Sequence, residues 1–268
     1  MKEIELLLKS KRNTEIPVSI VDSETSNCAL VIFIHGFKAD RHEGGRFTEV
    51  ARNLAKLGYS SIRMGFPGCD ESKEDFINYS ITNDLDDIET CYKYMLDTYN
   101  VDVNRIGAVG YSMGARLTTL FTGIHPEIKT IGLWAGACYE NYGGDNFLGC
   151  NIEEINKELV NKDYYDYFNT FDNTYIKLSK QLIEDMVKYN PVKCLNDFAG
   201  NAIVVHGNED ITVSVDTGYA NFKALKNAKN KKLVIIDGAN HGFGLWDDKM
   251  HQSRQLVEET TLFFKNNL

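Results

Sequence analysis

The sequence predicts a mostly parallel α/β sheet with helices on both faces, built as one domain over residues 1–268. Short apolar runs alternate along the chain with segments whose apolar residues recur at helical spacing, as in doubly wound folds. The runs are continuously apolar, which is typical of strands that helices cover on both sides. With 43% hydrophobic residues, a chain of 268 residues is long enough to bury one large core.

The predicted elements begin with an antiparallel hairpin over residues 4–21 that turns at Asn13. Apolar residues at helical spacing predict a first helix that ends near Gly58 and a second helix that Thr82 caps. A third helix follows Ser112. Core strands are expected at residues 30–34, 60–64, 106–109, 130–134, 202–205 and 233–236.

Residues 139–190 interrupt this alternation and are too many for an ordinary connection, so we interpret them as an inserted, mainly helical cap. One helix is expected over residues 152–160, and a second from the spacing of Tyr175, Leu178, Leu182 and Met186. Aromatic residues lie between these helices, and they either line an acyl pocket or form a small core of the cap. They are Tyr164, Tyr165, Tyr167, Phe168 and Phe171.

Composition and charge exclude several classes of partner. A formal net charge of -9 without a concentrated basic patch argues against nucleic acid. The longest strongly apolar run, residues 29–34, is too short to span a bilayer, and no secretory signal is visible, so we expect a cytoplasmic protein. Six scattered cysteines without a CxxC pair fit reduced thiols. The sequence leaves open whether the protein forms a homodimer.

The strongest chemical signal is the segment Gly110-Tyr111-Ser112-Met113-Gly114, a G-x-S-x-G pattern between an apolar strand and a helix. This is the context of a nucleophile elbow, in which small flanking residues let strand and helix approach around a strained serine. We therefore predict that Ser112 is a nucleophile.

A serine hydroxyl needs a base to take its proton, and that base needs an acid to orient it. His241 follows the last predicted strand in a glycine-flanked loop, and Asp210 follows the strand before it. The order Ser112, Asp210, His241 is the order that the elbow motif leads us to expect. Glu209 and Asp237 are rival carboxylates for the acid.

The negative oxygen of a tetrahedral intermediate needs two donors. We expect these to be the backbone amides of Met113, directly after the serine, and of Phe37, in the His35-Gly36-Phe37 loop after an earlier strand. The start of the helix after Ser112 adds positive potential at the same point.

Other polar clusters favour structural roles. Asp84, Asp86, Asp87 and Glu89 stand at a helix start, where acids complement the helix dipole, and they lack calcium-loop spacing. The histidines lack zinc-like spacing, and those at 35 and 206 are expected to be structural hydrogen-bonders. No Walker lysine or G-x-G-x-x-G is present. We predict neither a metal nor a cofactor.

The His35-Gly36-Phe37 loop, the elbow, Asp210 and His241 together make the chain resemble the alpha/beta-hydrolase superfamily over essentially its full length. The H-G-x-x-D segment ending at Asp210, the G-A-x-H segment ending at His241 and the place of the insertion look like bacterial cinnamoyl (feruloyl) esterases and the related serine-aminopeptidase-like hydrolases. The resemblance implies an eight-stranded sheet with a cap, and a serine esterase acting on small acyl or aromatic-acid esters.

Two alternatives remain at this stage. The same triad serves peptidases and thioesterases, because it specifies acyl transfer and leaves the choice of leaving group to the pocket. A binding protein on a hydrolase scaffold is a different class of function, although every expected catalytic position is filled here.

Overall fold

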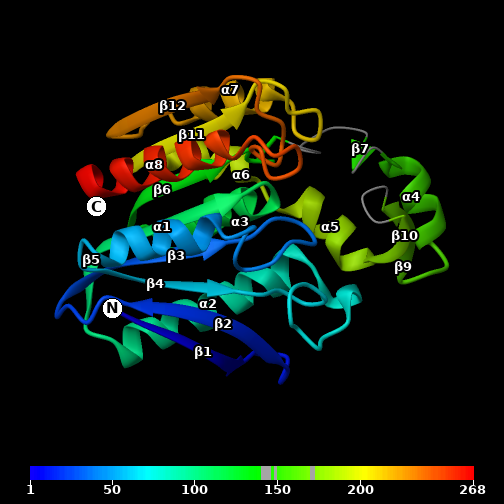
Figure 1. The fold of residues 1–268 in the computed structure, drawn as a ribbon. Helices are drawn as coiled ribbons and strands as arrows, with labels where there is room; N and C mark the ends of the chain where they lie inside the picture. The colour runs from blue at the N-terminus through cyan, green and yellow to red at the C-terminus, as the bar shows by residue number, and fades with distance from the viewer. Residues whose placement is uncertain (140–145, 148–149, 170–172) are drawn as a thin grey trace.

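The computed structural model describes residues 1–139, 146–147, 150–169 and 173–268. Eight strands form one sheet, in which β2 runs opposite to the other seven, so that β1–β2 and β2–β4 are antiparallel pairs and the remaining pairs are parallel. In spatial order they are β1 (Lys2–Lys9), β2 (Glu15–Asp22), β4 (Tyr59–Met64), β3 (Cys28–Ile34), β5 (Val101–Tyr111), β6 (Ile128–Trp134), β11 (Asn201–Gly207) and β12 (Asn230–Ile236). The predicted parallel, doubly wound sheet is therefore confirmed (Figure 1).

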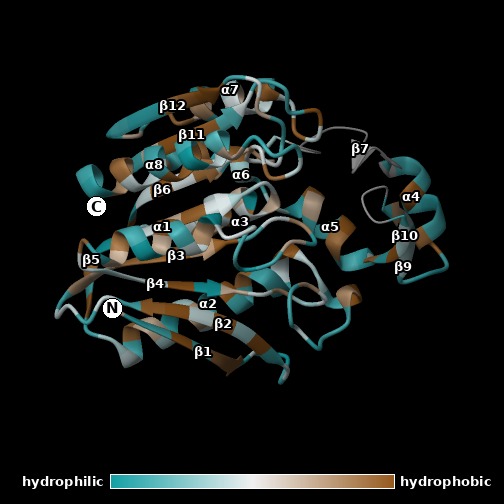
Figure 2. Ribbon diagram, viewed as in Figure 1, coloured by the Kyte–Doolittle hydropathy of each residue, from teal (hydrophilic) through white to brown (hydrophobic). Residues whose placement is uncertain are grey.

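Helices cover both faces of the sheet, because alternate residues of each central strand point to opposite sides. On β3, Val31 and Phe33 pack with α1 and α8, whereas Leu30 and Ile32 pack with α2 and α3. Figure 2 shows hydrophobic residues on the strands and mixed hydropathy along these helices. The helices outside the insertion are α1 (Arg46–Ala55), α2 (Ile81–Thr98), α3 (Met113–Ile124), α6 (Pro191–Asp197), α7 (Val215–Ala224) and α8 (Met250–Asn267).

Several predicted boundaries shift by a few residues. The N-terminal hairpin turns at Asn13, whose φ is 68°, and the segment after α1 ends at Gly58 with φ 86°. Helix α2 begins earlier than expected: Ser80, with extended φ, is its N-cap and its side chain accepts from the Asn83 amide. The predicted cap at Thr82 is wrong, because Thr82 lies inside the first turn.

The segment between β6 and β11 contains α4 (Ile152–Leu159) and α5 (Lys180–Lys188), close to the two predicted helices. It also contains β7 (Asn146–Phe147), β8 (Cys150–Asn151), β9 (Tyr164–Asn169) and β10 (Thr174–Ser179), which pair as two antiparallel hairpins. Tyr175 and Leu178 therefore lie on β10, not on a helix, and the expectation of a mainly helical insertion is corrected accordingly.

Of the two roles that the sequence left open for the aromatic residues of the insertion, the described residues show packing into a core for some of them and no pocket lining. Tyr165 and Tyr167 are half-buried against the apolar core that includes Leu178. Phe168 and Tyr175 are exposed, and their rings lie 5.1 Å apart as cross-strand partners. Phe171 lies outside the described residues. The described aromatics thus contribute partly to packing and partly to the surface of the hairpin.

Helix α5 joins the insertion to the main sheet, near the carboxyl ends of the strands (Figure 1). The buried carboxylate of Asp185 accepts hydrogen bonds from the Thr82 amide at 2.7 Å and from the Thr82 hydroxyl at 3.0 Å. The Arg116 guanidinium, on α3, donates to the Met186 carbonyl at 3.3 Å. These bonds fix α5 against the N-terminal turn of α2 and against the helix that follows Ser112.

Within the described residues, no helix has both the length and the hydropathy needed to cross a membrane. The five cysteines whose side chains are described are free thiols, four of them buried.

Replacement of Asp185 tests how the insertion is held. Asp185→Ala leaves the Thr82 amide at the buried start of α2 without its acceptor, so we expect the free energy of unfolding to fall by about 1–3 kcal/mol. Urea denaturation measures this loss. Asp166→Ala, which removes an exposed carboxylate from β9, is the matched control and should change stability by less than about 0.5 kcal/mol. Equal stability of the two variants would contradict the anchoring role.

Candidate active site

The site begins at Ser112, which stands in a sharp turn between β5 and α3. Its backbone is strained, with φ 54° and ψ -115°. The turn is held by bonds from the Ser112 amide to the Trp134 carbonyl, at 2.8 Å, and from the Ala137 amide to the Ser112 carbonyl, at 3.1 Å. A Cβ on Gly114 would lie 2.0 Å from the Ile34 carbonyl oxygen, so only glycine lets helix and strand meet here.

The three predicted triad side chains lie together. The Nε2 atom of His241 is 3.1 Å from the Ser112 hydroxyl oxygen, and its Nδ1 atom is 2.7 Å from Oδ2 of Asp210. The Asp210 carboxylate accepts the Nδ1 hydrogen, which leaves Nε2 unprotonated and able to accept from the serine. The geometry suits proton transfer from Ser112.

Asp210 is buried, and its second oxygen, Oδ1, accepts from the Thr212 and Val213 amides, both at 2.9 Å. Burial opposes its ionisation, but hydrogen bonds from His206 and His241 outweigh burial and lower the pKa of Asp210 to about 2. The Asp210 carboxylate is therefore ionised at neutral pH, beside the Nδ1 atom of His241.

The rival carboxylates do not reach His241. Glu209 is exposed, and Asp237 accepts a hydrogen bond from the Asn208 side chain at 2.8 Å. His206 is a further neighbour that sequence reasoning assigned only to structure: its Nε2 atom lies 2.9 Å from the Val213 carbonyl oxygen and 3.3 Å from Oδ2 of Asp210. The four-residue spacing between His206 and Asp210 is the one signal in the sequence that could have indicated this contact.

The two expected oxyanion donors follow neighbouring strands. Ile34 on β3 pairs with Gly110 on β5, and Phe37 and Met113 each come three residues later. Neither amide donates a hydrogen bond to another described residue. Met113 is also the first residue of α3, so the positive end of that helix dipole lies beside Ser112. The arrangement suits stabilisation of a negative oxygen next to the serine.

His35 has the structural role that the sequence predicted. Its Nδ1 atom lies 2.7 Å from the Gly36 carbonyl oxygen, and its Nε2 atom accepts from the Phe66 amide at 3.2 Å. Burial lowers the pKa of this imidazole, and the bond to the Gly36 carbonyl only partly offsets burial. Neutral His35 therefore holds the loop that carries Phe37.

The acidic side chains at the start of α2 do more than complement the helix dipole, because one of them pairs with a basic side chain from the N-terminal hairpin. Asp87 is buried and accepts from the Arg12 guanidinium at 2.7 Å, and Asp84 is buried as well. Burial raises the pKa of Asp87 to about 6, with Arg12 acting in the opposite direction. Among the residues that the structure describes, no group of three or more histidine, cysteine or acidic side chains is arranged to hold a metal ion.

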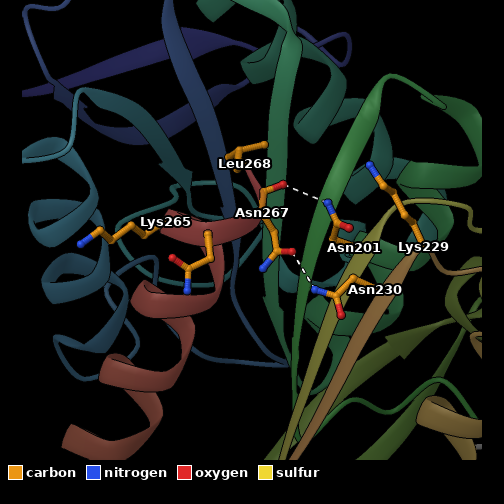
Figure 3. A pocket seen from close by; sticks show the side chains of 7 residues that line it. Asn201, Lys229, Asn230, Lys265, Asn267 and Leu268 are labelled. Carbon is orange, nitrogen blue, oxygen red and sulfur yellow. Dashed lines mark hydrogen bonds between the residues drawn. The ribbon is translucent and has the colours of Figure 1, made fainter.

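A polar hollow of about 430 Å³ lies elsewhere, at the amino ends of β11 and β12 (Figure 3). Its side chains bond to one another: Asn201 donates to the Asn267 backbone oxygen at 2.9 Å, and Asn230 donates to the Asn267 side chain at 2.8 Å. Asp210 and His241 follow the carboxyl ends of the same two strands, so this hollow is at the opposite edge from the candidate site.

Comparison with known families agrees with this geometry. The model of the prolyl oligopeptidase family, peptidase family S9, matches residues 47–268, a segment that contains Ser112, Asp210 and His241. The chain belongs to the prolyl oligopeptidase family. A search of curated protein sequences finds no match to the chain.

Solved structures share the fold at low sequence identity. Est1E from Butyrivibrio proteoclasticus, solved with ferulic acid bound, has a TM-score of 0.78 and 21% identity over 96% of this chain and 98% of its own. The esterase domain of a Rhodothermus marinus protein has a TM-score of 0.68 and 14% identity over 100% and 99%. The Pyrococcus furiosus esterase Pf2001 has a TM-score of 0.66 and 18% identity over 99% and 93%. The protein is an alpha/beta-hydrolase of the serine-hydrolase type.

The replacement Asp210→Asn tests whether the charge of this carboxylate contributes to the free energy of unfolding. The pKa of Asp210 is lower in the folded protein than the ordinary 3.8, so its charge stabilises the fold above pH 4 and this contribution is lost as the pH falls through about 2. We expect the variant to be less stable by roughly 2 kcal/mol at pH 6, and the gap to narrow by roughly 1 kcal/mol at pH 3. Urea denaturation at both pH values measures the gap.

Glu209→Gln is the matched control, since it neutralises the adjacent exposed carboxylate. Its stability difference from the wild type should stay within about 0.5 kcal/mol at both pH values. A gap for Asp210→Asn that is the same at pH 3 and pH 6 would show that the charge of Asp210 is not stabilised as described.

Proposed function

We propose that this protein is a serine carboxylesterase that hydrolyses small acyl or aromatic-acid esters through an acyl-enzyme on Ser112. The observation that carries the proposal is the continuous relay from the Ser112 hydroxyl through His241 to Asp210, with separations of 3.1 and 2.7 Å. A relay of this kind activates serine for attack on an acyl carbon.

In the first step Ser112 Oγ bonds to the ester carbonyl carbon while His241 Nε2 takes the hydroxyl proton. The carbonyl electron pair moves to oxygen, and the Phe37 and Met113 amides donate to that oxygen. The intermediate then collapses: the bond to the leaving oxygen breaks, and His241 gives its proton to the departing alcohol. Asp210 stabilises the imidazolium throughout.

In the second step a water molecule replaces the alcohol. His241 takes a proton from this water as its oxygen bonds to the acyl carbon, and a second oxyanion forms in the same place. Collapse breaks the bond to Ser112, whose oxygen recovers the proton from His241. The acid leaves and the enzyme returns to its starting state, so the cycle requires no redox group.

Two features support esters, including aromatic ones, as substrates. Two of the structures with the same fold are esterases by name, and a third, Est1E, has ferulic acid bound. Partly exposed aromatic rings also lie in the loop that carries the Phe37 amide and beside the His241 ring. Phe37, in the oxyanion loop, packs edge-on against Phe76 at 5.5 Å, and Trp246, 54% exposed, lies 6.0 Å from the His241 ring. Such rings offer stacking surfaces to an apolar or aromatic substrate.

The family name makes a peptidase the main competing reading, since an amide differs from an ester only in its leaving group. Matched substrates separate the two. An ester and an anilide with the same acyl group differ only in their leaving group, so their rates of hydrolysis can be compared directly. A thioester of the same acid tests for a thioesterase.

We expect the wild-type protein to hydrolyse p-nitrophenyl esters in the series from acetate to laurate, or methyl ferulate, faster than the matching anilides. Ser112→Ala should lower kcat by at least about four orders of magnitude, because the covalent intermediate can no longer form. Absorbance assays on both proteins, with circular dichroism to verify folding, make the measurement. Faster cleavage of the anilides would favour a peptidase, and identical rates for the two proteins would rule out Ser112 as the nucleophile.

A further inference from the structure

A buried ion pair outside the triad joins Glu43, in the segment between β3 and α1, to Arg46, the first residue of α1. The side chains of Glu43 and Arg46 are each only 4% exposed, and Oε2 of Glu43 is 3.4 Å from Nη2 of Arg46. Buried charges of this kind are rare and are retained where they are paired. Glu43 also has a φ of 49°, a region that non-glycine residues seldom adopt. Glu43 thus combines a buried charge with a strained backbone, and both lower the stability of the fold.

Glu43 contacts the loop that carries one expected oxyanion donor. Its Oε1 atom accepts from the Gly36 amide at 2.7 Å. The Gly36 carbonyl is bonded in turn to His35, and this carbonyl shares a rigid peptide plane with the Phe37 amide. Glycine has the freest backbone of any residue, so both peptide planes around Gly36 need an external bond to stay in place. Glu43 supplies one and His35 the other.

Arg46 contacts the loop that carries the base. Its Nη1 atom donates to the Gly242 carbonyl at 2.9 Å, and its Nε atom donates to the Glu43 carbonyl at 2.9 Å. The guanidinium lies over the Tyr111 ring, 5.1 Å from its centre, and the Tyr111 hydroxyl donates to the His241 carbonyl at 2.8 Å. Tyr111 therefore fixes the backbone carbonyl of His241, and Arg46 fixes the backbone carbonyl of Gly242.

We propose that Glu43 and Arg46 are positioning residues that hold the oxyanion loop and the His241 loop in register with Ser112. Glu43 does so through the Gly36 amide, and Arg46 through the Gly242 carbonyl and the Tyr111 ring. The proposal rests on acyl transfer to Ser112, the core of the proposed function, and does not depend on which substrate supplies the acyl group.

The charges around Glu43 fit a role in positioning better than a role in stability. Burial raises the pKa of Glu43 to about 7, while Arg46 and the Gly36 amide favour ionisation, and Asp40 adds to the upward shift. The buried Tyr111 hydroxyl faces the same cluster. Because this pKa lies above the ordinary value, the ionised carboxylate destabilises the fold at pH 8, and a neutral isostere removes that cost.

The test measures how fast a fluorophosphonate labels Ser112 at pH 8, because this reaction needs the serine, the base and the oxyanion hole but no ester turnover. Glu43→Ala removes the acceptor of the Gly36 amide, and we expect labelling and kcat on an active ester to fall about 10- to 100-fold, with KM changed less than about threefold. Glu43→Gln keeps an acceptor oxygen and should stay within about fivefold of the wild type. Its Tm should equal or exceed that of the wild type.

Two further variants complete the design. Arg46→Lys keeps the charge but not the fork that reaches Gly242, and should label about 5- to 10-fold more slowly even if Glu43→Ala fails to fold. Glu89→Ala is the matched control. This carboxylate bonds to His125 at the far end of α3, about 20 Å along the helix from Ser112, and its loss should leave labelling unchanged.

The proposal is overturned if Glu43→Ala or Arg46→Lys labels within twofold of the wild type, or if Glu43→Gln loses as much as Glu43→Ala. A merely structural pair would lower the Tm of Glu43→Gln and leave its rate intact. A wild-type protein that labels rapidly yet hydrolyses no ester would refute the esterase proposal alone, since the comparison of labelling rates would still stand.

Discussion

The turn at Ser112 is the constraint on which the arrangement of the site depends. Strand β5 ends and α3 begins within one residue, and the contact of Gly114 with the Ile34 carbonyl brings α3 against the end of β3. The strained backbone of Ser112 persists because Trp134 and Ala137 bond to it from the next strand and the loop after it. The serine hydroxyl thus emerges where the loops after β3, β11 and β12 converge.

Two buried carboxylates, Asp210 and Glu43, fix the positions of those loops. Asp210 is ionised through its hydrogen-bond donors and sets the tautomer of His241, whereas Glu43 is ionised less readily and is balanced by Arg46. The two carboxylates lie on different sides of the reacting groups, one behind the base and one behind the oxyanion loop. In the proposed reaction Asp210 stabilises a developing positive charge on His241, and Glu43 keeps in place the loop whose Phe37 amide meets a developing negative charge.

Most of the sheet, and the three side chains that meet at the candidate site, could be predicted from the sequence because they depend on local patterns. Apolar runs mark the central strands, and the strand before Ser112 distinguishes its G-x-S-x-G pattern from a chance match. The order and spacing of Asp210 and His241 after Ser112 favour Asp210 as the acid, and the structure excludes the adjacent Glu209 because Glu209 is exposed. Features that depend on tertiary contacts could not be predicted. Tyr175 and Leu178 have helical spacing, yet pairing with β9 places them in a strand. No local pattern marks Glu43 and Arg46 as a buried pair, because their burial depends on contacts with residues far along the chain.

The central claim is that Ser112 carries the acyl group between two half-reactions. Rapid acid quenching of the protein during turnover of p-nitrophenyl acetate, followed by peptide mass spectrometry, tests it directly. The account predicts an acetyl group on the peptide that contains Ser112, and none on the same peptide of Ser112→Ala. Full turnover of the ester with no acyl group on Ser112, or with the group on another residue, would contradict it.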